Sequence, residues 1–411
     1  MRSAVDDLSP AAELYLWGYP LLTVQRTKAI QCSSEAGGSL THRRNLATPA
    51  YKTVVAVNND TLYSSGWFDV RHGDLEIVVP PMDHPGRYWN VMILDAYTHL
   101  SYIRRRDHGV DGTSVRVTFD PSTPPASGPA RVLTHGTSLA WVIVRVLVES
   151  PDDLEAARSI QSRFEVRLAG AQPIERTERA GSPTAIHELG ASFVADLTSA
   201  VKDQPPAPWH TAPSRAAWAI LEDPSSAPAA DLAVGVAEAH RQIRGMNVHD
   251  SISTNGWSTG RASTGSAKDL MKRAVGTMFG LGGHEAIENR SYIARTLTAG
   301  GALDGDRPMQ LRFGPDDLPP CDGFWSLTAY GPDLHLVENE IDRFSIGDRT
   351  PGLIRDPDGG LTLQVAARRP ADISNWLPVP SGPFLLGLRV YEGDPDVVSG
   401  QWFPPPLVSA D

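Results

Sequence analysis

The stretch that decides the fold is "AVNNDTLYSSGWFDV", residues 56–70. Its second half has the small, aromatic and β-branched residues of a strand, whereas Asn58, Asn59 and Asp60 are residue types that strands disfavour. Asn and Asp side chains satisfy backbone groups in Asx turns, so we predict a turn that leads into a strand. An alternative stays open, in which the three side chains belong to a functional site.

Short runs rich in Val, Ile and aromatic residues extend outward from this stretch and return near the C-terminus. Pro, Gly and Asp turns separate them, which is typical of antiparallel sandwiches and barrels. We therefore expect one β region over residues 50–148 and another over residues 300–403. The runs are "YKTVVAV", "LEIVVP", "RYWNVMILDAY", "VRVTF" and "AWVIVRVLV" in the first region and "MQLRF", "GFWSLTAY", "LTLQVAA" and "FLLGLRVY" in the second.

Helical patterns precede the first β region and fill the chain between the two. Ser9 is placed to cap a first helix that begins at Pro10, and we expect this helix to end near Gly18 and Pro20. A second helix is predicted from Ser150 to Leu168, because apolar residues recur there at helical spacing. Further helical segments are "AIHELGASFVADLTSAV", "RAAWAILE", "ADLAVGVAEAHRQIRGM" and "AKDLMKRAVGTMFGLGG".

The fold class that these patterns predict is multidomain α+β, which suits 411 residues, because one hydrophobic core rarely supports so long a chain. We expect an N-terminal helix plus a first β-sandwich over residues 1–149. A helical subdomain follows over 150–282, and a second β-sandwich over 283–411.

Composition restricts the partners. A net charge of −11 argues against nucleic acid and anionic membrane, which both need a basic face. No apolar stretch is long enough to span a bilayer, and two cysteines make no disulfide framework. We expect a cytoplasmic protein with a small-molecule substrate, and a homodimer stays open. The run Arg104 to Arg106 is predicted to be mainly solvated, with an anion contact as the alternative.

Seven segments in order resemble bacterial proteins that pair domain of unknown function 1254 with domain of unknown function 1214. The resemblance implies two β-sandwich subdomains of jelly-roll type with a multihelical subdomain between them, and it implies little about activity. The segments are "AVNNDTLYSSGWFDV", "GRYWNVMILDAYTH", "LPPCDGFWSLTAYGPD", "DRFSIGDRT", "DGGLTLQV", "NWLPVPSGPFLLGLRVY" and "GQWFPPP".

This chain departs from the family pattern in three places. It begins almost at the first shared helix, whereas many relatives look exported, which supports the cytoplasmic expectation. His99 stands where relatives usually have Asn, and Arg104 to Arg106 replace a usual Gly-Thr-Arg turn. These changes add ionisable groups and favour a changed substrate.

The candidate catalytic residues come from two early segments. In "LDAYTH" the residues Asp95, Tyr97 and His99 alternate, so on a strand they would share one face. If Asp60 lies in the same hollow, two close carboxylates would split their pKa values and give one proton donor and one acceptor. We expect Asp60 or Asp95 as the base and His99 or Tyr97 as the donor, with substrate contacts from Asn58, Asn59, Tyr63, Arg106, Trp325, Arg343 and Arg389.

A metal site made of His84, Asp95, His99 and His108 is the alternative, although their spacing matches no known ligand motif, and we expect no metal. Phosphate-loop, dinucleotide and nucleophile-elbow motifs are missing, so we expect no cofactor. Trp325 favours a core position, and Arg389 on an apolar strand requires a carboxylate or an anionic ligand.

The function predicted is an enzyme that transforms a small molecule by acid–base chemistry without a redox cofactor. Hydrolysis, elimination and intramolecular cyclisation all fit, in a cleft between the two sandwiches and in biosynthetic tailoring. The alternative is a β-sandwich that binds carbohydrate or another small ligand without catalysis.

Overall fold

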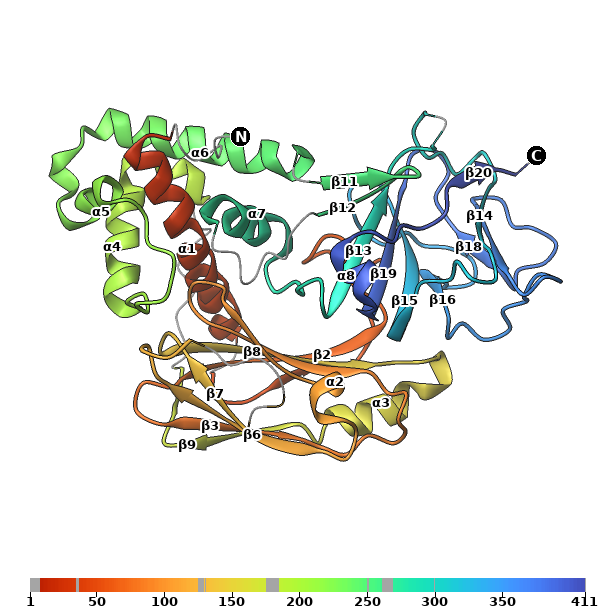
Figure 1. The fold of residues 1–411 in the computed structure, drawn as a ribbon, viewed down its shortest axis with the longest axis horizontal. Helices are drawn as coiled ribbons and strands as arrows, with labels where there is room; N and C mark the ends of the chain where they lie inside the picture. Colours follow the sequence, from red (N-terminus) through yellow and green to blue (C-terminus); the bar gives the residue numbers. More distant parts are fainter. Residues whose placement is uncertain are drawn as a thin grey trace.

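The protein is mixed α+β in a computed structural model that describes residues 8–34, 37–124, 129, 131–174, 185–249, 251–260, 269–298 and 300–410, without the side chains of 34 and 246–249. Two sheets lie at the base of Figure 1, the helices stand above one end of them, and two further sheets stand above the other end. The described residues contain eight α-helices and four sheets.

The first β region has two sheets that share one hydrophobic core. Buried side chains from both sheets, among them Leu62, Val144 and Val117, form a single cluster. Sheet one has the order β1 (Thr41–Arg43), β2 (Thr61–Asp69), β8 (Leu139–Leu147), β4 (Trp89–Leu94) and β5 (Leu100–Arg104), with β10 (Gln172–Pro173) also on β2. Sheet two has the order β7 (Val132–His135), β6 (Thr113–Phe119), β3 (Asp74–Val79) and β9 (Glu165–Ala169).

The second β region is built in the same way. Its two sheets share a core that includes Trp325, Leu388 and Leu363. Sheet three has the order β11 (Ser251–Thr254), β12 (Trp257–Gly260), β13 (Asn289–Ala294), β19 (Leu385–Gly393), β15 (Cys321–Tyr330) and β16 (Ser345–Gly347). Sheet four has the order β18 (Trp376–Pro378), β17 (Leu361–Ala366), β14 (Met309–Phe313) and β20 (Leu407–Ser409).

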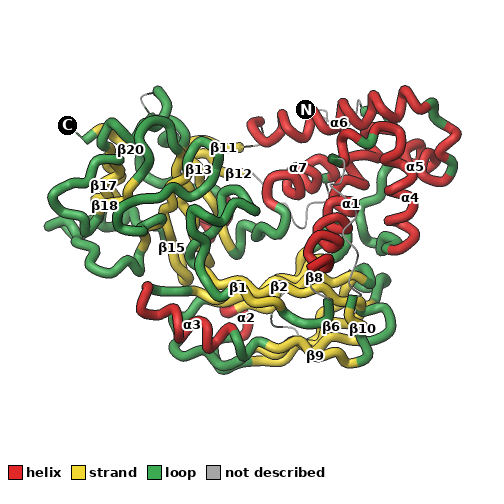
Figure 2. Tube along the Cα trace, turned by 180° about the vertical axis from the view of Figure 1, so that it is seen from behind, coloured by secondary structure: helices red, strands yellow, loops and turns green. Residues whose placement is uncertain are grey.

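Four helices, α4 to α7, gather around α1 and cover one end of sheet one, whereas α2 and α3 lie beside the base sheets and α8 lies beside β19. Trp141, Ile143 and Leu94 on that sheet join the helical core, and Figure 2 shows the helices over this end from behind. The α-helices are α1 (Pro10–Ser34), α2 (Arg105–His108), α3 (Leu154–Gln161), α4 (Phe193–Asp203), α5 (Arg215–Glu222), α6 (Ala229–His249), α7 (Leu270–Gly280) and α8 (Pro395–Ser399). The 3-10 turns are η1 (Pro151–Asp153), η2 (Ile186–Glu188), η3 (Gly190–Ser192) and η4 (Pro224–Ser226).

The upper face of sheet one is therefore divided between two covers. At the other end, Tyr88 and Leu147 pack against Phe324 and Tyr391 of the second β region. This junction places side chains from residues 60–150 against side chains from residues 280–395.

Several sequence expectations are wrong in detail. The first helix is capped by Ser9 as predicted, but it continues through Gly18 and Pro20 to Ser34, because its apolar side chains are buried in the helical core. The predicted helix to Leu168 ends at Gln161, and Glu165–Ala169 pairs with β3 as a strand. Tertiary pairing outweighs local helical spacing there.

Two further corrections concern strands. The pattern did not predict β11 and β12, which lie inside the range expected to be helical and pair with β13 through β12. The pattern also did not predict the short strand Leu407–Ser409, which follows the C-terminal prolines and pairs with β14. No helix in the described part of the chain has both the length and the hydropathy to cross a bilayer.

Candidate functional site

Four polar side chains lie next to one another across sheet one at the junction. Tyr63 on β2 pairs with Arg145 on β8, Arg145 pairs with Asn90 on β4, and Asn90 pairs with Arg104 on β5. Directly paired residues of an antiparallel sheet point to the same face. Because Val144 and Val146 point into the core below, the row points up toward the second β region.

Four further side chains complete the group: three come from distant parts of the chain, and one comes from the residue just before β4. His284 and Glu288 come from the segment between α7 and β13, Tyr391 from β19, and Tyr88 precedes β4. Glu288 Oε1 accepts hydrogen bonds from the Tyr88 hydroxyl at 2.6 Å and from Asn90 Nδ2 at 3.1 Å. We call this set the junction cluster: Tyr63, Tyr88, Asn90, Arg104, Arg145, His284, Glu288 and Tyr391.

Five buried polar atoms of the junction cluster have no hydrogen-bond partner among the described residues. They are Asn90 Oδ1, Arg145 Nε and Nη1, His284 Nδ1 and Glu288 Oε2. Buried polar groups in folded proteins are almost always hydrogen-bonded, so each exception requires an explanation. These five atoms are donors and acceptors that ordered water or a bound molecule can complete.

The charges of the cluster suit proton transfer. Burial raises the pKa of Glu288 to about 7, and the hydrogen bond from Tyr88 and the charge of Arg104 oppose this rise without cancelling it. Burial and the neighbouring Arg145 cation lower the pKa of His284 well below its usual value, so this imidazole is neutral at pH 7. A carboxyl group that exchanges its proton near neutral pH is the type that general acid–base catalysis uses.

The hydrogen bonds also assign the tautomer of His284. Its Nε2 lies 3.4 Å from the amide nitrogen of Asn90, which is a donor, so Nε2 acts as the acceptor. The proton of the neutral ring is then on Nδ1, the nitrogen without a partner. His284 therefore presents an N–H donor beside the Glu288 carboxyl group.

Part of the predicted site lies beside this cluster. Asn58 Oδ1 accepts from the backbone N–H groups of Asp60 and Thr61, which confirms the predicted Asx turn. Asn58 Nδ2 donates to the Tyr391 hydroxyl at 2.6 Å, and Asp60 Oδ2 accepts from Ser326 at 2.7 Å. Arg389 donates to the Ala56 carbonyl at 2.6 Å. Four predicted residues therefore lie at the junction: Asn58, Asp60, Tyr63 and Arg389.

Other predicted substrate contacts have structural partners instead. Asn59 accepts from Ser345 and donates to a carbonyl, and Arg343 donates to three carbonyls between Ile373 and Trp376. Trp325 is buried in the core of the second β region. These three positions hold loops and sheets together.

The prediction that Arg104 to Arg106 are mainly solvated is wrong. Arg104 is buried and pairs with Asp107, and Arg105 pairs with the buried Glu392. Only Arg106 is exposed, and it donates to the Ile287 carbonyl at the surface. Strand β5 ends at Arg104, and two carboxylates from a distant part of the chain lie beside this run: Glu288 beside Arg104 and Glu392 beside Arg105.

The expectation that Asp95 and Asp60 share a hollow is also wrong. Strand β4 ends at Leu94, and residues 95–99 form a turn in which Thr98 has φ +67°, so Asp95, Tyr97 and His99 do not alternate on a strand. Asp60 lies beside the Leu147 end of β8, whereas Asp95 lies beside its Leu139 end. Eight residues of a strand separate these positions by about 26 Å.

Asp95 has a different set of neighbours at that end of the sheet. Its Oδ1 accepts from the backbone N–H groups of Tyr97 and His99, and its Oδ2 lies 2.9 Å from His210 Nε2, although the two atoms are poorly aligned for a hydrogen bond. Burial alone would raise the pKa of Asp95, but His99 and His210 together hold it well below its usual value. The Tyr97 hydroxyl donates to the Gln204 carbonyl.

The residues that could form a metal site differ from the predicted set. His84 lies 3.3 Å from Glu149 and His108 lies in α2, but Asp95, His99 and His210 have ligand-type atoms within 4.8 Å of one another. Metal-binding imidazoles donate their second ring N–H to an acceptor. Here the Nδ1 atoms face donors instead, the Ala207 N–H for His210 and Arg273 for His99. The protons are then on Nε2, so the His210 Nε2–H lies next to the Asp95 carboxylate and neither Nε2 is free to bind a metal.

We therefore expect that chelation leaves the protein unchanged. After dialysis against a chelator the melting temperature should match that of the untreated protein, and elemental analysis should find no stoichiometric transition metal. A stoichiometric metal whose removal lowers the melting temperature, and whose return restores it, would contradict the proton assignment.

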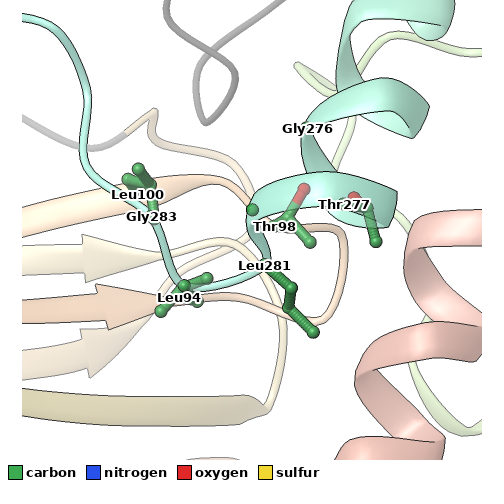
Figure 3. Close-up of a pocket in the computed structure, with 9 residues that line it drawn as sticks. Leu94, Thr98, Leu100, Gly276, Thr277, Leu281 and Gly283 are labelled. Carbon is green, nitrogen blue, oxygen red and sulfur yellow. The ribbon is translucent and has the colours of Figure 1, made fainter. Parts of the chain in front are cut away.

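A small cavity lies between the two sites. It has a volume of about 20 Å³ and is bounded by Leu94, Leu100, Thr98, Thr277 and Leu281, with glycines 276, 280, 282 and 283 (Figure 3). This volume holds about one water molecule, so no substrate fits there. Gly282 connects the cavity to the junction cluster, because its carbonyl accepts from Arg145 Nη2 at 2.6 Å.

Two polar residues within apolar strands of the sequence could have predicted part of the junction cluster. Arg145 stands in "AWVIVRVLV" and Asn90 in "RYWNVMIL", each a polar residue in a buried apolar strand. The same argument was applied to Arg389, and it holds equally for these two positions. Nothing local indicated that His284 and Glu288, in "GLGGHEAIE", would lie above them.

Two family models match the chain, and together they cover more than half of it. Residues 38–167 match Protein of unknown function (DUF1254), and residues 288–395 match Protein of unknown function (DUF1214). No curated protein matches. The junction cluster takes residues from both matched segments, and His284 lies just before the second.

One of two similar solved structures supports the fold. The VPA0106 protein from Vibrio parahaemolyticus is 21% identical with a TM-score of 0.71, and the alignment covers 98% of this chain and 99% of that chain. A putative uncharacterized protein from Burkholderia cenocepacia is 12% identical with a TM-score of 0.46, over 96% of this chain and 87% of that chain. The first shows that the whole chain shares a fold with a protein of known structure.

Proposed function

The chain belongs to the family of proteins that pair domain of unknown function 1254 with domain of unknown function 1214. These names assign no activity, so we propose the function from the site itself. The protein is an enzyme that transforms a small molecule by acid–base chemistry at the junction cluster. Hydrolysis, elimination and intramolecular cyclisation are the reaction types that such a site serves without a redox cofactor, and biosynthetic tailoring is the setting we propose.

One observation carries this proposal. Five buried donor and acceptor atoms without hydrogen-bond partners lie in the junction cluster, and one of them is Oε2 of Glu288, whose carboxyl proton is exchangeable near pH 7. Glu288 transfers the proton: Tyr88 and Asn90 hold its Oε1, and Oε2, which makes no hydrogen bond and lies 3.7 Å from Arg104 Nη1, is the atom that meets the reacting molecule. His284 Nδ1–H donates to an oxygen on which negative charge develops.

The experiment that tests the proposal is metabolite profiling. The folded protein and a heat-denatured sample are incubated with a small-molecule extract, and compounds that decrease are matched with products that increase by mass. Conversion by the folded sample alone is the expected result. Enrichment of a compound without any product would instead favour the alternative, a β-sandwich that binds carbohydrate or another small ligand.

We also propose the sandwich type of the two β regions, the subdomain boundaries and the cellular location. We propose that each pair of sheets is a jelly-roll-like β-sandwich, since each pair encloses one hydrophobic cluster. We further propose subdomain boundaries near residues 149 and 282. The unpaired Cys32 and Cys321 support a cytoplasmic location. The net charge of −11 supports a partner other than nucleic acid or membrane.

A further inference from the structure

Arg145 has a positive charge for which the described residues supply no counter-ion. Resting on the proposed function, we infer that its guanidinium binds a carboxylate group of the substrate. The substrate class of the junction cluster is then a small organic acid.

The contacts of Arg145 leave most of its donors unused. The side chain is 4% exposed, and its Nη2 donates to the Gly282 carbonyl at 2.6 Å. Its Nε and Nη1 have no acceptor in the described part of the chain. These two nitrogens carry three of the five N–H bonds of a guanidinium group.

Other arginines of the described chain with little exposure have carboxylate or carbonyl acceptors, including Arg273, which donates to the Tyr97 carbonyl. Arg87 binds Asp83 and Asp153, Arg104 binds Asp107, and Arg105 binds Glu392. Arg290 has no carboxylate, but it donates to Thr259 and to the carbonyls of Gly260 and Val398. Like Arg290, Arg145 has no carboxylate oxygen of the described residues within 4.0 Å. Among the buried arginines of the described chain, Arg145 alone has two buried guanidinium nitrogens without an acceptor, whereas Arg290 has one, and a single carbonyl accepts from Arg145.

The surroundings of Arg145 supply dipoles instead of negative charge. The Tyr63 ring lies 5.0 Å from the guanidinium carbon, and the phenols of Tyr88 and Tyr391 are close enough to interact with its charge. A buried cation without an anion is unfavourable unless a ligand supplies the charge. One guanidinium with phenols around it balances a single negative charge, which fits a carboxylate better than a phosphate dianion.

The geometry also relates this carboxylate to the acid–base group. Arg145 and Asn90 are direct cross-strand partners, and Asn90 Nδ2 donates to Glu288. A carboxylate held at Arg145 therefore places the rest of the molecule next to Asn90 Oδ1, His284 Nδ1 and Glu288 Oε2. Arg145 binds the substrate and Glu288 exchanges the proton.

The test uses small probes on the whole chain at constant ionic strength. Acetate and benzoate are expected to raise the melting temperature, whereas their neutral matches acetamide and benzamide are not. Arg145→Met should abolish the acetate and benzoate shifts and should fold at least as stably as the wild type, because it removes an unbalanced charge. The exposed Arg106→Met is the matched control and should keep both shifts.

The outcomes separate this inference from the proposed function. Equal shifts with acetate and acetamide, an unchanged shift in Arg145→Met, or a shift with inorganic phosphate alone would overturn the inference. If Arg145→Met does not fold, a crystal of the wild type soaked in acetate decides, since a carboxylate within hydrogen-bond distance of Nε or Nη1 is required. Glu288→Gln should keep the acetate shift whether or not it loses turnover, so failure of the acid–base proposal would leave the carboxylate site standing.

Discussion

Glu288→Gln is expected to lower turnover by about 10²–10⁴-fold, the usual contribution of one general acid or base. The amide keeps the shape of the carboxyl group and its contacts with Tyr88 and Asn90, but it does not exchange a proton. The measurement is turnover of the substrate identified by metabolite profiling, at equal concentrations of folded protein. The wild type should also show a limb in its pH–rate profile with a midpoint near pH 7, which the variant lacks.

Stability provides an independent control for this variant. The pKa of Glu288 is raised to about 7 in the folded protein from its ordinary value of 4.5, so the folded state binds more protons than the unfolded state between these pH values. The contribution of Glu288 to the free energy of unfolding is therefore present below about pH 4.5 and is lost as the pH rises to about 7, by on the order of 3 kcal/mol. Glu288→Gln should lack this loss. Full turnover in a variant that folds normally would exclude Glu288 as the proton-transfer group.

Arg87→Met is expected to lower the free energy of unfolding by about 3 kcal/mol. Arg87 is 1% exposed and donates to Asp83 at 3.0 Å, to Asp153 at 2.7 Å and to the Leu147 carbonyl at 2.9 Å. It thereby fixes the end of β8 that carries the junction cluster. Methionine fills a similar volume but leaves the Asp153 carboxylate without a cation, with the Glu149 backbone N–H as its remaining donor. Urea unfolding measures the difference.

The matched control is Arg167→Met. Arg167 also pairs with two carboxylates, Glu165 and Glu76, but all three side chains are largely exposed. Exposed ion pairs contribute little, so we expect no measurable change. A loss in the Arg87 variant no larger than in the Arg167 variant would show that the buried ion pair does not stabilise this end of the sheet.

The sequence predicted local features of the fold better than contacts between distant segments. The Asx turn at Asn58 and the cap at Ser9 depend on neighbouring residues, and both are confirmed. The end of the first helix at Pro20 and the helix to Leu168 were wrong, because burial against other elements decides these segments. The strands at 251–260 were missed for the same reason.

The candidate site shows the same limit. Polar residues in apolar strands pointed to buried polar groups, and Asp60 and Tyr63 do lie at the junction. The pairing of Tyr63 with Arg145 and of Arg145 with Asn90 depends on the order and register of β2, β8 and β4, which local patterns do not contain. The approach of Glu288 depends on the docking of two β regions that are far apart in the chain. For this reason Asp95 was grouped with Asp60, although about 26 Å of β8 separates them.

The central claim is that Glu288 is a buried carboxyl group that exchanges its proton near neutral pH. Infrared difference spectra of the wild type against Glu288→Gln, recorded from about pH 5 to about pH 9, test it directly. The account predicts a protonated carboxyl band at the acid end that is replaced by carboxylate bands with a midpoint near pH 7. Carboxylate bands that persist unchanged down to about pH 5 would contradict it.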